Sequence, residues 1–224
     1  TDEIARLSVY FFRQGRTAED ALELTRVAAI AAKVAAIDMT DSANYLTSAI
    51  NGFGMAADEA MSVSDKFAAL GASSASSYEE MAIALSKVAP VARTAGVGID
   101  FMMGILAKGI ETTREAPENI GTAFKTVFAR MTQIREFGAT LDDATGVNKV
   151  EEALKQAGVA LRDSEGQFRN MDAVLTELGM AFDTLDRNQQ AYIATALAGT
   201  RQQSRLLAVM QNFNRTMELV DIST

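Results

Sequence analysis

The stretch PENIGTAFKTVFARM, residues 117–131, decides the fold class of this 224-residue chain. Its apolar residues recur every three or four positions, which predicts an amphipathic helix with one face turned to a core. Pro117 fits the first turn of that helix, where a missing N–H breaks no hydrogen bond. The apolar stripe is the clearest long one in the sequence and comprises Ile120, Phe124, Val127, Phe128, Met131 and Ile134.

The composition around this stretch also favours helix. Hydrophobic residues make up 48% of the chain, but aromatic residues are only 7%, tryptophan is absent and there are two prolines. Alanine and unbranched side chains lose little freedom in a helix, so a core rich in alanine, leucine and methionine favours helical structure. Of the two prolines, Pro90 is expected to kink or end the helix that contains it.

Further helical stripes and glycine breaks predict an all-α fold, an irregular antiparallel bundle of about eight or nine helices. We divide it provisionally into an N-terminal helical half, residues 1–98, and a C-terminal half, residues 99–224. The exception to helix is a small β-hairpin near residues 159–169, with a turn at 163–166 that ends in Gly166. The chain is expected to finish in one long helix over residues 188–219, with a bend at Gly199.

The net charge limits the partners. The chain carries a formal charge of −8 and has a pI near 4.7. An acidic chain repels phosphate, so binding to nucleic acid or to an anionic membrane surface is disfavoured. The opening Thr1-Asp2-Glu3 has neither an initiator methionine nor a basic signal region, and we expect the chain to be one continuous segment of a much longer polypeptide.

The absence of both histidine and cysteine excludes most enzyme chemistry. Ser–His and Cys–His nucleophile systems and Cys/His zinc sites all require one of these residues. Adjacent carboxylates occur at Glu79–Glu80, Asp142–Asp143 and Glu151–Glu152, where we expect a solvated surface with ordinary pKa values. We therefore expect no catalytic residue, no cofactor and no metal site, and we expect that the chain is not an enzyme.

Two alternatives concern the apolar segments. Val27–Ile37 is too short to cross a bilayer, which takes about 20 residues, and its alanines fit a close helix contact in a soluble fold better. A membrane-active module using this segment and Met102–Ile110 remains the rival interpretation. The eleven methionines fill either a core poor in aromatics or an adaptable binding surface.

Several motifs resemble one known family when they are read in order. Residues 45–54 are YLTSAINGFG, residues 121–131 are GTAFKTVFARM, residues 162–169 are RDSEGQFR and residues 198–204 are AGTRQQS. In this order and spacing they are similar to the core region of tail tape measure proteins from long-tailed bacteriophages and prophages. The resemblance covers about residues 6–220, although no single motif is diagnostic by its chemistry.

The resemblance implies structural work. Proteins of that family set tail length, because tube subunits polymerise around several copies, and they leave through the tube when DNA is ejected. It implies contacts with other copies of itself, with tail tube and distal tail or tip proteins and with tail assembly chaperones. The implied location is the virion, in the tail lumen or tip, and the host cytoplasm during assembly, with membrane contact only during ejection.

The family supplies no catalytic residue to carry over, so the candidate site is a set of packing and turn residues. They are expected to carry structure through helix–helix contacts. The set is Phe124, Val127, Phe128, Met131, Leu206 and Phe213, with the glycines Gly121 and Gly166.

Overall fold

The computed structural model describes residues 2–132 and 147–224, and these residues form an all-α fold. The expected all-α class is confirmed, but the expected count of eight or nine helices is wrong, because the described residues contain twelve α-helices and a short 3-10 helix. Their bounds are α1 (Asp2–Arg13), α2 (Ala18–Ala35), α3 (Met39–Phe53), η1 (Ala57–Glu59), α4 (Ala60–Ser73), α5 (Tyr78–Thr94), α6 (Ile99–Thr113), α7 (Pro117–Met131), α8 (Val147–Gln156), α9 (Met171–Phe182), α10 (Arg187–Ala198), α11 (Gln203–Met210) and α12 (Phe213–Ser223).

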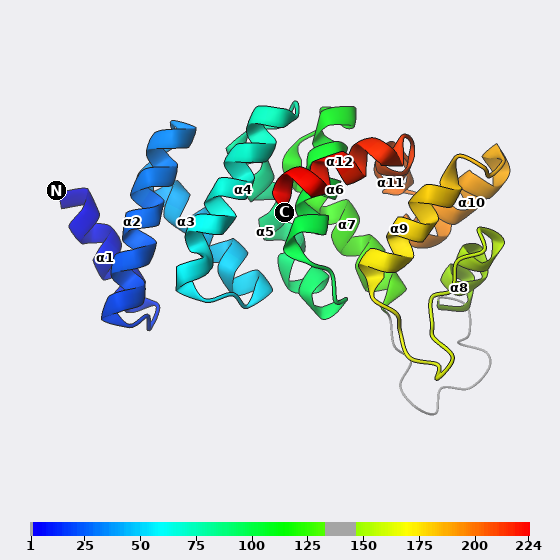
Figure 1. The fold of residues 1–224 in the computed structure, drawn as a ribbon, viewed down its shortest axis with the longest axis horizontal. Helices are drawn as coiled ribbons and strands as arrows, with labels where there is room; N and C mark the ends of the chain where they lie inside the picture. The colour runs from blue at the N-terminus through cyan, green and yellow to red at the C-terminus, as the bar shows by residue number, and fades with distance from the viewer. Residues whose placement is uncertain (1, 133–146) are drawn as a thin grey trace.

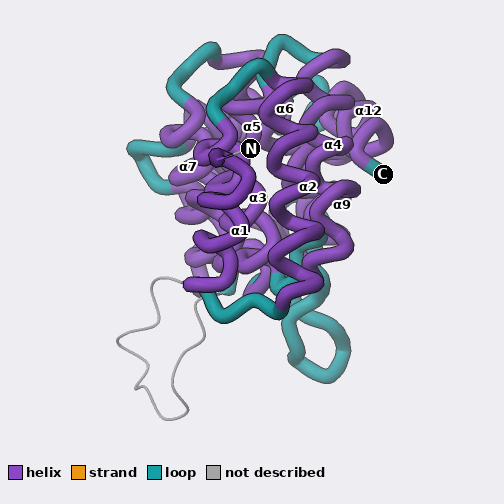
Figure 2. The backbone as a smooth tube through the Cα atoms, turned by 90° about the vertical axis from the view of Figure 1, so that its left-hand side faces the viewer, coloured by secondary structure: helices purple, strands orange, loops and turns teal. Residues whose placement is uncertain are grey.

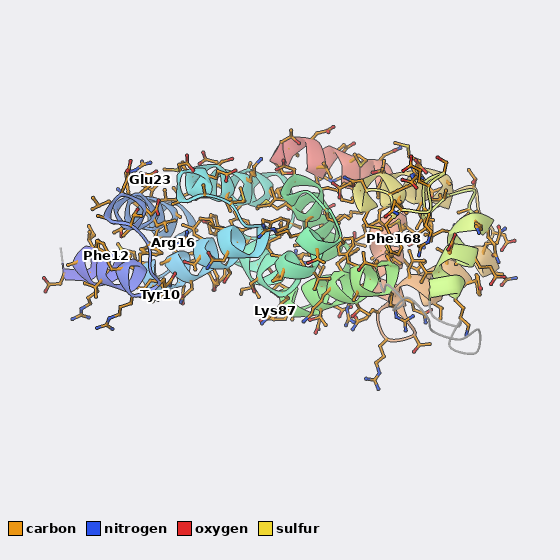
Figure 3. All side chains as sticks on the ribbon, turned by 90° about the horizontal axis from the view of Figure 1, so that it is seen from below. Tyr10, Phe12, Arg16, Glu23, Lys87 and Phe168 are labelled. Atoms are coloured by element: carbon orange, nitrogen blue, oxygen red, sulfur yellow. The ribbon has the colours of Figure 1, made fainter. Side chains whose placement is uncertain are left out.

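The helices form an elongated array of two layers. Figure 1 shows α1 to α7 following one another from the N-terminal end toward the middle of the molecule. Successive helices alternate between the layers, so α3 packs on α5 and α5 on α7, while α2 packs on α4 and α4 on α6. The two rows are visible in Figure 3, which views the array from below.

Local sequence sets the helix starts. The hydroxyl of Thr17 accepts a hydrogen bond from the amide of Asp20 at 3.1 Å and so caps the start of α2. Ser77 and Glu80 form a full capping box at the start of α5, each side chain bonded to the other residue's amide. These caps satisfy amides that the first turn of a helix leaves without a carbonyl partner. Pro90 lies inside α5 and does not end it.

The predicted β-hairpin at residues 159–169 is wrong. Among the described residues it is reduced to one isolated antiparallel bridge between Arg162 and Phe168. The segment is short because Val159 still bonds back to Leu154 in α8, whereas Asn170 already caps α9. Next to the bridge the amide of Asp163 donates to the carbonyl of Gln167 at 2.9 Å and that of Arg169 donates to the carbonyl of Leu161 at 3.1 Å, and among the described residues the pairing goes no further.

The predicted long C-terminal helix is also wrong, since residues 188–219 fall in three helices. α10 ends at Gly199, whose φ of +73° and ψ of 167° are not helical. A second break lies at Asn212, which adopts a left-handed conformation before α12. Asparagine tolerates this conformation better than most residues. The sequence analysis did not predict a break at Asn212. The two extra breaks account for part of the higher helix count.

Helix α6 lies at the centre of the array. All ten residues from Phe101 to Ile110 are buried, which is the pattern of a helix surrounded by protein on every side. It contacts α4, α5, α7, α11 and α12. The chain returns to it at the end, because α12 packs against both α4 and α6, and the C-terminus therefore lies in the middle of the molecule (Figure 1).

Two of the expectations concern residues outside the described ranges. Ile134, the last member of the α7 stripe, and the acidic pair Asp142–Asp143 lie outside the described residues. The division into halves at residues 98 and 99 stays a prediction.

Candidate interaction surface

The predicted packing residues of α7 are buried, and Gly121 lies where this helix contacts α5. A side chain at Gly121 would place its Cβ 2.2 Å from the carbonyl oxygen of Ala84, so only glycine permits this approach of the two backbones. Beyond this point Phe124, Val127, Phe128 and Met131 are all fully buried. The rings of Phe124 and Phe128 lie with their centroids 6.4 Å apart. The predicted stripe is thus the buried face of α7.

The remaining predicted residues lie in two other places. Leu206 is buried in α11, and the ring of Phe213 at the start of α12 covers Gly179, where a Cβ would come within 2.3 Å of it. Gly166 lies in the α8–α9 turn with φ +80° and no atom within 4 Å of its Cβ position. Seven of the eight predicted residues therefore take part in helix packing, whereas Gly166 lies in an exposed turn.

That turn is organised by its own side chains. The carboxylate of Asp163 accepts hydrogen bonds from the amides of Glu165 and Gln167, both at 2.9 Å. The guanidinium carbon of Arg162 lies 4.1 Å from the centroid of the Phe168 ring, a cation–π contact. These contacts fix the shape of the turn and provide no group suited to chemistry.

Ion pairs that sequence reasoning missed join the C-terminal helices to the middle of the array. Arg215 on α12 donates to Glu111 on α6 at 3.0 Å and to the carbonyl of Ser73 at 2.8 Å. Arg205 on α11 pairs with Glu115, just after α6. The partners are 104 and 90 residues apart, so no local sequence pattern could have revealed them.

A third pair completes this junction. Lys66 on α4 lies 2.6 Å from the carboxylate of Asp100 on α6 and also donates to the carbonyl of Ser223 at the end of α12. The hydrogen bond from Arg215 lowers the pKa of Glu111 below its ordinary value. We call these three pairs, Lys66–Asp100, Glu111–Arg215 and Glu115–Arg205, the C-terminal clamp.

The acidic pairs Glu79–Glu80 and Glu151–Glu152 each contain a residue that makes a structural contact. Glu79 accepts from the hydroxyl of Tyr45 at 2.9 Å, and burial together with this bond raises the pKa of Tyr45 to about 12. Glu151 lies 3.4 Å from Lys155 and 3.7 Å from Arg162. Within the described ranges no three acidic side chains converge in a way that would hold a metal ion.

The exposed apolar side chains gather at one end of the array. Of the nine large ones in the described residues, six lie on α1 and α2, which Figure 2 views end-on. Leu22 and Val34 are the most open of these six, at 65% and 64% exposed. Figure 3 shows Phe12 and Glu23 at this end of the molecule. We call the six residues the end surface: Ile4, Val9, Phe12, Leu22, Ile30 and Val34.

Comparison with known proteins gives the family. A family model described as phage-related minor tail protein matches residues 1–199. The chain belongs to this family. It is also 26% identical over 174 residues to a probable tape measure protein of Escherichia phage P2, an alignment that covers 77% of this chain and 20% of that protein. No solved structure matches.

The family makes the chain a structural phage tail protein, and a virion component. Because the alignment covers only about a fifth of the P2 protein, the chain corresponds to a limited part of that relative. None of the helices in the described part of the chain is long and apolar enough to span a membrane.

Proposed function

We propose that the chain is the core segment of a tail tape measure protein, which helps to set the length of a long phage tail. The observation that carries this proposal is the family match over residues 1–199 together with the similarity to a probable tape measure protein. In this role the segment works through packing, with no catalytic residue and no cofactor. It nucleates tail assembly with tube and tip proteins and is released when DNA is ejected.

The buried helix contacts suit this role. The α5–α7 contact at Gly121 and the C-terminal clamp give the segment one defined compact form to present to assembly partners. The partners proposed are further copies of the chain, the tail tube, distal tail or tip proteins and the tail assembly chaperones. The protein acts in the host cytoplasm during assembly and then in the tail lumen or tip.

The length-setting role is tested by adding residues to the protein in the phage that encodes it. One or two further copies of residues 2–35 are inserted before residue 2, so that the original fold stays intact. A ruler gains at most about 1.5 Å of tail for each added helical residue. We expect tails measured by electron microscopy to lengthen in equal steps with the number of added copies.

A matched control separates length from fold. An insertion of the same composition in shuffled order is expected to give the same lengthening if residues are counted along an extended chain. Tails of unchanged length across the whole series, with virions still formed, would refute the length-setting role.

The alternative is a module that perturbs the host envelope during DNA delivery, using Val27–Ile37 and Met102–Ile110. It has less support because every residue of Met102–Ile110 is buried in the compact fold. Ile30 and Val34 are exposed, however, and could reach a bilayer. Dye-filled liposomes test it: leakage at micromolar protein would favour this role, and intact liposomes over the whole concentration range would remove it.

A further inference from the structure

The second halves of α5 and α7 contain basic residues but no acidic ones. Residues 81–99 and 119–132 include four Lys or Arg and no Asp or Glu, although the whole chain has a net charge of −8. All four side chains are exposed. None of them forms an ion pair with a carboxylate of the described residues, whereas seven other basic residues do. We call the four the basic surface: Lys87, Arg93, Lys125 and Arg130.

These charges lie in one part of the molecule because α3, α5 and α7 run in the same direction. At the helix starts, Tyr45 donates to Glu79, and the pKa of Tyr45 is raised by burial, by this hydrogen bond and by the nearby charge of Glu118. Near the helix ends, a Cβ at Gly52 would meet the Cβ of Ala89. The acids of the three helices therefore lie toward one edge of the array, and the basic surface lies toward the opposite edge, the lower one in Figure 1.

Lys87 and Lys125 border the contact between α5 and α7. A Cβ at Gly121 would lie 2.9 Å from the Cβ of Lys87, so this lysine leaves α5 directly beside the backbone of α7. Lys125 follows Gly121 by about one helical turn and lies on the same side of α7. Pro90 and Thr122, three residues from the lysines, are short, neutral and exposed. Figure 3 shows Lys87 at the margin of the row formed by α1, α3, α5 and α7, where a partner can reach it.

The two arginines lie at the ends of neighbouring helices and contact neutral groups. The guanidinium of Arg93 lies against Gly54, the C-cap residue of α3. Arg130 donates to the carbonyl of Ala196 at 3.0 Å, near the end of α10. Basic side chains stabilise the carbonyl groups at a helix C-terminus, which gives the arginines a structural role. These contacts hold the guanidinium groups in place without pairing them with a carboxylate.

That structural role does not extend to the lysines. Lys87 and Lys125 lie in the middle of their helices, more than one turn from either end. A solvated lysine costs the fold nothing, but two of them beside two fixed guanidinium groups, with no acid among them, form a concentrated positive charge on an acidic chain. Such a charge favours a negatively charged partner and repels a positively charged one.

The dimensions of the basic surface match those of a helix. Packed helices lie about 8–10 Å apart. Lys and Arg are six residues apart on α5 and five on α7, which is about 8–9 Å along each helix. Carboxylates seven residues apart on a helix share one face and lie about 10 Å apart. Two turns of an acidic helix are therefore enough to cover the surface.

A nucleic acid matches it less well. DNA carries one negative charge for about every 1.7 Å of its length. A duplex would therefore extend past the basic surface onto the remainder of a chain whose net charge is −8, where its phosphates would be repelled.

We propose that the basic surface binds an acidic helix of another tail protein. Carboxylates of that helix pair with Lys87 and Lys125 at the α5–α7 contact and with Arg93 and Arg130 at the lower edge. The inference rests on the proposed function, because it names the surface and the partner chemistry through which the segment contacts other tail proteins.

Binding of two synthetic peptides to the purified chain tests the proposal. Both are alanine-rich helices of about 21 residues, long enough to be helical alone, with the same number of glutamates. One peptide has its glutamates along a single face, and the other has them distributed around the helix. By fluorescence anisotropy we expect the single-face peptide to bind at low salt with a Kd of about 0.1 mM. It should bind at least about fivefold more tightly than its isomer and about tenfold more weakly in 0.2 M salt.

Charge reversal locates the site. Lys87→Glu combined with Lys125→Glu should weaken binding of the single-face peptide at least about tenfold. The matched control combines Arg6→Glu with Lys33→Glu, which changes the net charge equally at exposed positions of α1 and α2. It should change the Kd less than about twofold. Circular dichroism checks that both double variants are folded, and Lys87→Gln with Lys125→Gln replaces the reversal if that variant is not.

The remaining outcomes overturn the proposal. No binding of the single-face peptide up to about 1 mM protein does so, as does equal binding of the two peptides. Equal losses in the two double variants would show a response to net charge alone. A DNA duplex of about 20 base pairs that binds more tightly than the peptide, and depends on Lys87 and Lys125, would make the surface a nucleic-acid site.

These measurements are independent of the tail-length experiment. Failure of peptide binding leaves the length-setting role standing, since that role is read from tails that lengthen with added residues. Tails of unchanged length with intact peptide binding would overturn the length-setting role alone.

Discussion

At the scale of single residues, three glycines mark the points of closest helix contact in the described core. A Cβ at Gly121 would meet the backbone of Ala84, one at Gly104 would meet Val220, and one at Gly179 would meet the ring of Phe213. The corresponding distances of 2.2, 2.4 and 2.3 Å are all below any real Cβ contact. Glycine is costly inside a helix, so its presence at these sites reflects the packing.

Gly121→Ala tests this interpretation through the sign of its effect. In an unobstructed helix this change would stabilise by about 1 kcal/mol because alanine is the better helix former. Here the new methyl group meets the carbonyl of Ala84, and overpacking of this kind costs about 1–3 kcal/mol. We expect urea unfolding to show a lower midpoint concentration, with the dependence of the unfolding free energy on urea concentration unchanged.

The neighbouring Thr122→Ala is the control, because Thr122 is exposed on the same helix. It should shift the midpoint little or raise it slightly. A Gly121→Ala protein more stable than the parent chain would show that α5 and α7 do not meet at this point.

At the scale of helices, the C-terminal clamp determines how the chain closes on itself. In the middle of the array, Glu111 pairs with Arg215 on α12 and Glu115 pairs with Arg205 on α11. Lys66 contacts both Asp100 on α6 and the end of α12. The side chains of Glu111 and Arg215 are only 23% and 27% exposed, so their interaction is less screened than that of an open surface pair. The clamp thus adds to the apolar contact of α12 with α6.

The pH dependence of stability reports on the clamp. Because Arg215 lowers the pKa of Glu111 in the folded chain, the pair stabilises the fold fully above the ordinary carboxyl pKa. That contribution is lost as pH falls through the lowered pKa. We expect Glu111→Gln to be less stable than the parent chain at pH 7, with the difference shrinking as the pH falls toward 3. Urea unfolding at each pH measures it.

Asp172 provides a control of opposite sign. Burial raises its pKa in the folded chain, so its ionisation opposes folding and acid relieves the penalty. An Asp172→Asn variant should therefore lose any advantage over the parent chain as the pH falls. A Glu111→Gln difference that stays constant from pH 7 to 3 would contradict the assigned ion pair.

The helices show what the sequence could and could not predict. The α7 stripe could be predicted because it depends on neighbours within one or two helical turns. The predicted hairpin is reduced to one bridge between the ends of α8 and α9, and the predicted long last helix is interrupted at Gly199 and again at Asn212. The clamp depends on partners about 100 residues apart, which local patterns cannot specify. Ile30 and Val34 belong to the segment expected to make a close helix contact but are exposed, since periodicity alone does not distinguish a covered face from an open one.

At the scale of the whole molecule, the described residues form a closed, elongated array with an apolar end. The alternation of layers from α1 to α7 and the return of α12 to α4 and α6 give the segment a compact form. A length-setting role, in contrast, requires an extended chain inside the tail. The proposal therefore implies that the compact array is the form of the segment before or outside that extension, and that the clamp and α12 must release first.

Small-angle X-ray scattering of the 224-residue chain, extrapolated to zero concentration, tests the compact form most directly. A compact chain of this length has a radius of gyration of about 17 Å, and the elongated array should give about 20 Å. The unfolded chain would give about 51 Å by the same scaling, and a single straight helix would be about 336 Å long at 1.5 Å per residue. We predict a value near 20 Å, and one near 50 Å or above would contradict the closed helical array.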